Sequence, residues 1–390
     1  MAQVKTQNNL PAITNVFLNV TQKCNLKCKY CFVCQQPKDI TLDVAKDAAK
    51  FVAKNALNVG RKPSINFFGG EPMLKYEDII KPLTLWIREN YGDAFELSLT
   101  TNGMLLTEEV MKFFDENNVG MLFSIDGDKE TQDINRPRHD GKGSFDQLEP
   151  IIDLVLKYHP TMTFRATVDP PTHKNLYKNY KFAVGKGYTN CFFIPNVFHD
   201  WTDEELNELD AELDKICDYY IEELRAGRKP IRFNHFEEAV GDIRKIIDLK
   251  DGEFREWARN TLGGGRCGIG VGSSGGIGVK GDIYTCQEMV ENPDVGDKFK
   301  IGNIYEGVDD NKRRKVAEMY DAEAITCSDE SYCEDCPKKR ICNGGCCINN
   351  FFKYDSLNVI DYVMCWYERK CIEKAYRILS LQKKGELKWV

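Results

Sequence analysis

Along the first 200 residues, two hydrophobic patterns alternate. Short runs rich in β-branched and aromatic residues have the length of buried strands, and we expect six of them: Asn15–Val20, Ser64–Phe68, Glu96–Thr100, Gly120–Ile125, Thr163–Val168 and Asn190–Ile194. Amphipathic stretches lie between them, and their capping residues predict helices that open at Thr41, near Glu77, at Thr107, at Ser144 (with Gln147 as a capping box) and at Thr172. This α/β order predicts a parallel sheet curled toward a barrel or a doubly wound sheet, with ligands bound where strands end.

The pattern changes after residue 200. Thr202 and Glu205 have capping-box spacing, and one apolar face follows at helical intervals: Leu206, Leu209, Leu213, Ile216, Tyr220 and Leu224. Further helices are predicted over Phe236–Leu249 and Asp361–Gln382, and ten glycines lie in Thr261–Gly281. We therefore expect an N-terminal extension (1–14), a core (15–200), bridging helices (201–261) and a Cys-rich domain with a C-terminal helix (262–390).

Sixteen cysteines in 390 residues are more than packing requires, because a chain of this length buries a core without covalent staples. They indicate either a disulfide-rich secreted protein or a reduced protein whose thiolates bind metal. The first ten residues lack a secretion signal, and no apolar run is long enough to span a membrane. The net charge of −7 argues against nucleic acid. We expect a cytoplasmic, metal-binding protein with no membrane or nucleic-acid partner.

The first group of cysteines, Cys24, Cys28 and Cys31, follows the first predicted strand. Three thiolates on one short loop hold three corners of an iron–sulfur cubane and leave the fourth iron open to an outside molecule. A structural zinc site takes four ligands, and Cys34 would supply the fourth. The spacing alone leaves both interpretations open.

The wider context of this loop resembles the radical S-adenosylmethionine (SAM) enzymes. The spacing Cx₃Cx₂C comes just after the first strand, and the segments Gly69–Pro72, Thr100–Gly103 and Ser124–Gly127 end the next three. The resemblance implies a partial (β/α)₆ TIM-like barrel whose [4Fe–4S] cluster, on Cys24, Cys28 and Cys31, cleaves SAM to methionine and a 5′-deoxyadenosyl radical. It implies that SAM is contacted by Tyr30, Gly69, Gly70, Glu71, Thr100, Asn102, Ser124, Asp126 and Arg165.

The C-terminal cysteines are similar to the SPASM domain that follows the barrel in many radical SAM enzymes. That pattern implies two auxiliary [4Fe–4S] clusters, three in all: a distal one on Cys333, Cys336, Cys342 and Cys365, and a proximal one on Cys267, Cys286 and Cys346. The fourth proximal ligand is either Cys327 or absent, which leaves an iron open. We interpret Cys34, Cys191, Cys217 and Cys371 mainly as small buried hydrophobes. The glycine-rich stretch around Lys280–Asp282 predicts a hairpin.

SPASM enzymes mostly modify peptides, so the resemblance implies oxidation of a ribosomally made precursor peptide, most simply to a thioether or other crosslink. The alternative is a sulfatase-maturing enzyme that forms formylglycine. Two departures count against it: Gln287 follows Cys286 where that subgroup has an aspartate, and Phe32-Val33 stands where it has Phe-Tyr. The sequence singles out no catalytic base.

An alternative from another functional class is a non-catalytic iron–sulfur electron carrier or a scaffold stabilised by zinc. Neither of these proteins would need the residues predicted to contact SAM. An enzyme would need an electron donor, and Lys23, Lys27 and Lys29 suit an acidic flavodoxin or ferredoxin. About 14 residues precede the first strand, too few for a leader-peptide recognition domain. Leader recognition is then expected from a separate protein or the bridging helices, or is absent.

Overall fold

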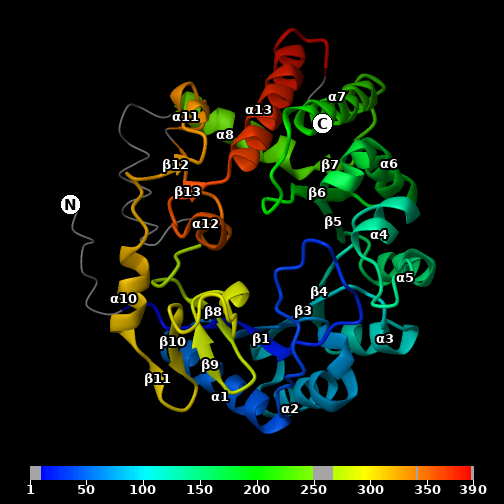
Figure 1. Cartoon of the computed structure of the whole chain (residues 1–390). Helices are drawn as coiled ribbons and strands as arrows, with labels where there is room; N and C mark the ends of the chain where they lie inside the picture. Colours follow the sequence, from blue (N-terminus) through cyan, green and yellow to red (C-terminus); the bar gives the residue numbers. More distant parts are fainter. Residues whose placement is uncertain (1–9, 249–266, 340, 388–390) are drawn as a thin grey trace.

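The computed structural model describes residues 10–248, 267–339 and 341–387. It confirms the predicted α/β fold, with helices on the outer side of a curved set of strands (Figure 1). The six predicted strands are all present: β1 (Asn15–Thr21), β2 (Ser64–Gly69), β3 (Glu96–Thr101), β4 (Val119–Phe123), β5 (Thr163–Val168) and β6 (Asn190–Pro195).

These strands form a partial barrel. β1, β2, β3 and β4 pair in parallel and in chain order, and β5 pairs in parallel with β6. The two sheets meet where Ser124 bridges to Arg165. Within the described residues the outer edge of β1 pairs with β8 (Ser274–Ile277), and β6 pairs with β7 (Arg232–Phe233), so the six strands do not close on themselves.

Six helices cover the barrel: α1 (Leu42–Asn58), α2 (Lys81–Tyr91), α3 (Glu108–Glu116), α4 (Lys129–Asn135), α5 (Phe145–Tyr158) and α6 (Leu176–Lys186). Thr41 and Thr107 cap α1 and α3 as predicted, each accepting a backbone hydrogen bond three residues on. The stretch near Glu77 begins as a wider turn, Tyr76–Ile80, before α2, and short α4 was not predicted.

One predicted helix cap and one predicted helix start are wrong. Ser144 precedes α5, but its side chain accepts no capping hydrogen bond in the described structure. Its hydroxyl is buried and instead donates to the Arg136 carbonyl, while the Gln132 amide donates to it. Thr172 lies in a 3₁₀ turn (Pro170–Asn175), because two prolines fix the backbone there, and α6 begins only at Leu176.

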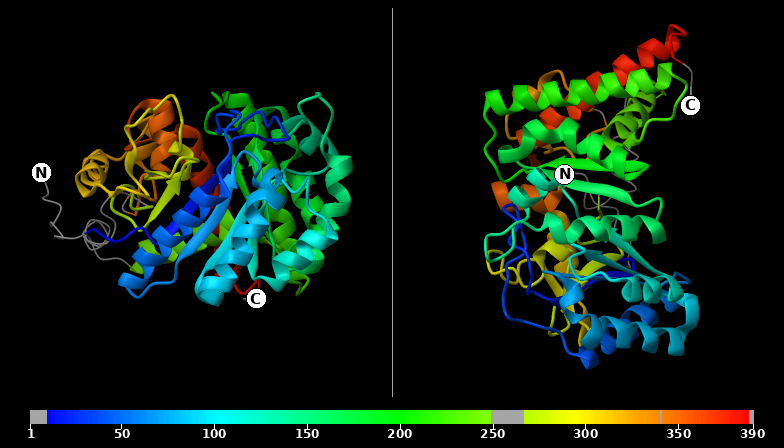
Figure 2. Two further views of the ribbon diagram at one scale, coloured as in Figure 1. Left: turned by 90° about the horizontal axis from the view of Figure 1, so that it is seen from below. Right: turned by 90° about the vertical axis from the view of Figure 1, so that its right-hand side faces the viewer.

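The predicted bridging helices are α7 (Asp203–Arg225) and α8 (Asn234–Asp248). Thr202 and Glu205 form the predicted capping box, and the apolar face of α7 is buried. α7 lies beside the last helix, α13 (Tyr362–Lys383) (Figure 2). Leu249 and the glycines before Cys267 lie outside the described residues.

The Cys-rich part consists of short elements: β9 (Asp282–Tyr284), β10 (Lys300–Asn303), β11 (Gly307–Val308), α10 (Asp310–Glu318), β12 (Thr326–Cys327), α11 (Ser331–Glu334), α12 (Cys347–Tyr354) and β13 (Val359–Ile360). β8 and β9 form the predicted hairpin, turning at Gly281, whose φ of 82° suits glycine. Since β8 also pairs with β1, this region continues the barrel sheet. No helix among the described residues is both long and apolar enough to cross a membrane.

Candidate active site

The loop that carries Cys24, Cys28 and Cys31 is fixed at both ends. Where it leaves β1, the Thr21 hydroxyl donates to Asp39 over 2.6 Å, and the Lys23 ammonium contacts the same carboxylate at 2.7 Å. The end of β2 holds it from the side, because the Gly70 N–H donates to the Thr21 carbonyl at 2.9 Å. The loop is therefore held against the carboxyl ends of β1 and β2.

Gly69 and Gly70 permit this close approach. A Cβ on Gly69 would lie 2.0 Å from the Thr21 carbonyl oxygen, and one on Gly70 would lie 2.3 Å from the Lys23 carbonyl oxygen. Gly69 also has a φ of 135°. The family resemblance implies that these two glycines contact SAM; in the structure, the close neighbour that requires them is the backbone of the cysteine loop.

The three thiols of this loop are close enough to affect one another but do not form a single-ion site. Burial raises the pKa of Cys24 to about 12 and of Cys28 to about 11. Among the described residues, the one group of three or more candidate metal ligands whose atoms all lie within 4.8 Å is His235, Glu238 and Glu368. The three loop sulfurs therefore do not all lie within this distance of one another, whereas a cubane cluster contacts its thiolates at separate irons. Such a cluster would also overcome the cost of ionising buried thiols.

A buried network underlies the loop. The Tyr30 hydroxyl donates to Asp126, and the Arg136 guanidinium donates to Tyr30 at 3.0 Å and lies 3.9 Å from Asp126. Burial raises the pKa of Asp126, and its carboxylate also accepts from the Thr167 N–H and the Asn135 amide. The polar atoms of Tyr30 and Asp126, both predicted to contact SAM, therefore already have partners within the protein.

The carboxylate of Glu71 is engaged in a similar way. It is 1% exposed and accepts hydrogen bonds from the Met73 N–H, the Thr101 hydroxyl and the Asn102 N–H at 2.7–3.0 Å. Asn102 in turn donates to Asn25 at 2.7 Å and lies 3.8 Å from the sulfur of Cys24. Thr100 donates to Asn66. Glu71 and Asn102 therefore join the ends of β2 and β3 to the cysteine loop, whereas Thr100 joins β3 to β2.

Arg165 and Ser124 differ from this set. The Arg165 guanidinium lies over the Phe192 ring at 4.8 Å, and in the described structure it makes no hydrogen bond or ion pair. Burial lowers its pKa. The hydroxyl of Ser124, whose backbone bridges to Arg165, likewise has no partner in the described part of the chain. An unengaged guanidinium and hydroxyl at adjoining strand ends suit an anionic group such as a carboxylate.

The C-terminal thiols fall into two groups. In the first, the Cys327 N–H donates to the Cys333 sulfur at 3.3 Å, the Cys327 and Cys365 side chains are hydrogen-bonded, and Cys336 and Cys342 lie beside Cys333. Cys327 therefore lies with the predicted distal ligands and not with the proximal ones, for which it was one of two alternatives. The pairing of β12 with β13 causes this, since it brings Cys327 to the start of α13, where Cys365 lies.

The second group contains Cys267, Cys286 and Cys346, as predicted, together with Cys347. Cys347 is buried at the start of α12, and its side chain is hydrogen-bonded to Cys267. Glu288 lies beside this group; burial first, and then the Cys267 thiolate, raise its pKa to about 7. Of the four cysteines expected to be buried, Cys191, Cys217 and Cys371 are, whereas Cys34 is exposed.

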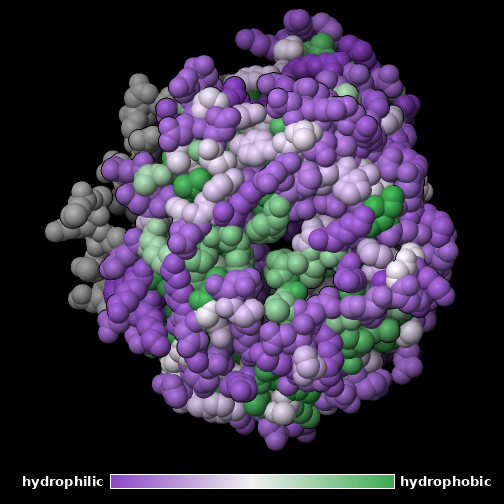
Figure 3. All heavy atoms as spheres, viewed as in Figure 1, coloured by the Kyte–Doolittle hydropathy of each residue, from purple (hydrophilic) through white to green (hydrophobic). Residues whose placement is uncertain are grey.

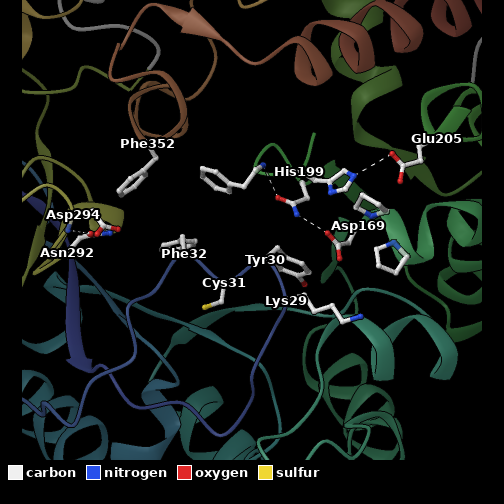
Figure 4. Close-up of a pocket in the computed structure, with 14 residues that line it drawn as sticks. Lys29, Tyr30, Cys31, Phe32, Asp169, His199, Glu205, Asn292, Asp294 and Phe352 are labelled. Carbon is white, nitrogen blue, oxygen red and sulfur yellow. Dashed lines mark hydrogen bonds and ion pairs between the residues drawn. The ribbon is translucent and has the colours of Figure 1, made fainter. Parts of the chain in front are cut away.

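A cavity of about 790 Å³ lies between the cysteine loop and the Cys-rich part (Figure 4). The space-filling view shows a hollow with apolar side chains beside it near the middle of this face (Figure 3). Sequence reasoning missed most of its walls, because they come from loops after β5 and β6 and from α12, far apart in the chain. The lining comprises Lys29, Tyr30, Cys31, Phe32, Asp169, Pro170, Pro171, Asn196, Phe198, His199, Glu205, Asn292, Asp294 and Phe352.

Comparison with known proteins finds relatives over nearly the whole chain. Residues 18–213, half of the chain, match the profile of the radical SAM superfamily. A cysteine-type anaerobic sulfatase-maturating enzyme of Clostridium perfringens is 26% identical, over 94% of this chain and 97% of the relative. Among solved structures, native anSMEcpe with bound AdoMet and Cp18Cys peptide superposes with a TM-score of 0.71 at 22% identity, covering 95% of this chain and 99% of that one.

A second solved structure is Streptococcus suis SuiB bound to the precursor peptide SuiA. It has a TM-score of 0.60 at 16% identity and covers 92% of this chain and 77% of that one. At these identities the superpositions show a shared fold, including the Cys-rich part.

Proposed function

The chain belongs to the radical SAM superfamily, and we propose that this enzyme oxidises a side chain of a ribosomally made peptide, with a thioether or other crosslink as the product. The observation that carries the proposal is the cavity, which places Cys31 of the cysteine loop opposite Phe352 of the Cys-rich part. The cavity of about 790 Å³ is bounded by the cysteine loop and by the Cys-rich part, so a bound peptide would share it with the groups held at Cys31. That both structural neighbours were solved with bound peptides supports a peptide substrate.

The residues present fit the cofactors of this superfamily. Cys24, Cys28 and Cys31 would hold a [4Fe–4S] cluster, and Arg165 with Ser124 would bind the carboxylate of SAM. When bound, these groups supply a 5′-deoxyadenosyl radical that removes one hydrogen atom from the substrate. We propose that Glu71, Asp126 and Tyr30 position the cysteine loop and do not bind SAM through their polar atoms. Those atoms already form hydrogen bonds within the protein.

The two C-terminal groups would hold the auxiliary clusters. Cys333, Cys336, Cys342 and Cys365 form the distal ligand set that we propose, and Cys267, Cys286 and Cys346 form the proximal set. Cys347, which touches Cys267, replaces Cys327 as the candidate fourth proximal ligand. Counting iron and recording Mössbauer spectra of Cys347→Ala and Cys327→Ala tests this choice. Cys347→Ala should alter one cluster, whereas unchanged spectra would leave the proximal iron open.

Partner proteins are also part of the proposal. Lys23, Lys27 and Lys29 are exposed around the cysteine loop, where they would attract an acidic flavodoxin or ferredoxin. A separate leader-recognition protein remains our proposal for presenting the precursor.

Formylglycine formation is the second candidate, favoured by the similarity to a sulfatase-maturating enzyme along nearly its full length. Gln287 argues against it, because an amide cannot take up a proton as an aspartate does. Glu288 is the nearest carboxylate along the chain, and one of its oxygens is buried without a hydrogen-bond partner.

One experiment separates these functions. The anaerobically reconstituted protein is incubated with SAM, a reductant and either the neighbouring precursor peptide or a sulfatase-derived peptide. A crosslinking enzyme produces 5′-deoxyadenosine and a peptide that has lost two hydrogen atoms and does not react with a hydrazide. A hydrazide-reactive aldehyde would support the second candidate. Absence of 5′-deoxyadenosine with every peptide would favour an electron carrier and overturn the proposal.

A further inference from the structure

Three phenylalanine rings line the cavity from three separate segments. Phe32 follows Cys31 on the cysteine loop, Phe198 lies between β6 and α7, and Phe352 lies on α12. Phe198 meets Phe352 edge to face at 6.5 Å, and Phe32 stacks on Phe68 at 6.3 Å. Figure 4 shows Phe32 and Phe352 facing the same space from opposite sides.

Two of these rings are unusually exposed. Phe32 is 36% exposed and Phe198 is 43% exposed. Each ring contacts one aromatic neighbour, Phe68 and Phe352 respectively, but this contact leaves much of its surface open to solvent. Leaving phenyl surface in water forgoes about 25 cal/mol for each Å² that burial would remove. The surface is therefore available to stabilise a bound apolar group, and aromatic pairs gain further from edge-to-face contact.

The polar side of the same cavity carries excess negative charge. Asp169, Glu205 and Asp294 face one ammonium, that of Lys29, and one imidazole, that of His199, which lies 3.4 Å from Glu205. Asp294 is exposed and makes no ion pair within the described residues, while Asp169 accepts from the Asn196 amide at 2.8 Å. An acidic side chain entering this space would meet like charges.

We propose that Phe32, Phe198 and Phe352 bind an aromatic side chain of the substrate peptide next to the residue that is modified, and that the cavity excludes an acidic side chain at that position. This rests on the proposed function, because it takes the occupant to be a peptide. Phe32 follows Cys31 on the cysteine loop and lines the same cavity as Phe198 and Phe352, so a side chain held between the rings brings the neighbouring residue of the peptide toward this loop.

The test uses a fluorescein-labelled peptide with a central cysteine in an alanine–glycine background and one guest residue beside the cysteine. Binding to the reconstituted enzyme with SAM, without reductant, is measured by fluorescence anisotropy. A tryptophan or phenylalanine guest should bind about tenfold more tightly than alanine, as expected for burying one aromatic ring, and aspartate should bind most weakly. Equal binding of all guests would overturn the inference.

Variants locate the effect. Phe198→Ala should reduce the preference for an aromatic guest to about twofold or less, and Phe352→Ala should act in the same direction. Tyr376→Ala is the matched control, because Tyr376 is an exposed aromatic residue on α13 outside the cavity; it should keep the full preference. A preference that survives Phe198→Ala contradicts the assignment. Peptide oxidation without any guest preference would refute this inference alone, whereas failure to oxidise any peptide would refute the proposed function.

Discussion

The barrel and the Cys-rich part both present groups of cysteines, but they support them differently. The loop of Cys24, Cys28 and Cys31 rests on a parallel sheet and a large core, and buried carboxylates with protein partners lie beneath it. The Cys-rich part has strands as short as two residues and a second core of ten buried residues, one of them Cys347. We infer from this difference that the protein alone shapes the barrel site, whereas the clusters proposed for the C-terminal thiols would supply much of the order around them.

The largest expected effect falls on the barrel. Cys28→Ala should reduce SAM cleavage by about a hundredfold or more, because the cluster loses one of its three thiolates. The readout is 5′-deoxyadenosine formed under reducing, anaerobic conditions. Cys34→Ala is the control and should retain cleavage, since Cys34 is an exposed cysteine of the same loop. Equal loss in both variants would instead indicate a four-thiolate site.

Removing iron tests whether the barrel and the Cys-rich part depend differently on bound clusters. After chelation we expect hydrogen exchange to rise first in residues 326–339 and 341–360, where few backbone groups lie in long elements, while β1 to β3 stay protected. Mass-spectrometric hydrogen exchange of holo and chelated protein measures this. Simultaneous loss of protection in both regions would show that the barrel also depends on its cluster.

Arg136→Gln tests whether the buried network supports the barrel site. Although burial opposes it, the neighbouring Cys28, Tyr30 and Asp126 raise the pKa of Arg136. Removing this cation leaves Asp126 buried without a charge partner, so unfolding free energy should fall by about 3–5 kcal/mol, measured by urea denaturation of metal-free protein.

Arg165→Gln is the matched control for that variant. It should leave stability nearly unchanged, because the Arg165 guanidinium has no ion pair in the described structure, and should weaken SAM binding instead. The opposite pattern, with Arg165 stabilising and Arg136 dispensable, would reverse the roles we assign.

The smallest effect concerns the anchor of the cysteine loop. Burial acts against it, but hydrogen bonds from Lys23 and Thr21 lower the pKa of Asp39 to about 2. An unfolded aspartate has a pKa of about 3.9, so the stabilisation is present above that pH and is lost as pH falls toward 2. Asp39→Asn should cost less than about 1 kcal/mol in metal-free protein near pH 6. The difference between variant and wild type should shrink as the pH falls from about 3.9 toward 2, where about half of the folded-state carboxylate is protonated.

Sequence patterns predicted the barrel strands to within about two residues, because each is a continuous buried run with turn residues beside it. The sequence patterns predicted the role of a side chain wrongly where its partner lies elsewhere in the chain. The Ser144 hydroxyl is taken by Gln132 and Arg136, and Cys327 joins Cys365 only through the pairing of β12 with β13. Spacing also identified the cysteine loop, but the cavity walls depend on how loops of separate elements meet.

The most direct test of the account compares radical formation with peptide oxidation in one reaction. Cys286→Ala removes a proposed proximal ligand and leaves the barrel loop intact. Incubated with SAM, reductant and the substrate peptide, this variant should still form 5′-deoxyadenosine at a rate within about threefold of wild type, while modified peptide falls by about tenfold or more. If both products fall together, or if peptide oxidation is unchanged, the division of labour between the barrel and the Cys-rich part is wrong.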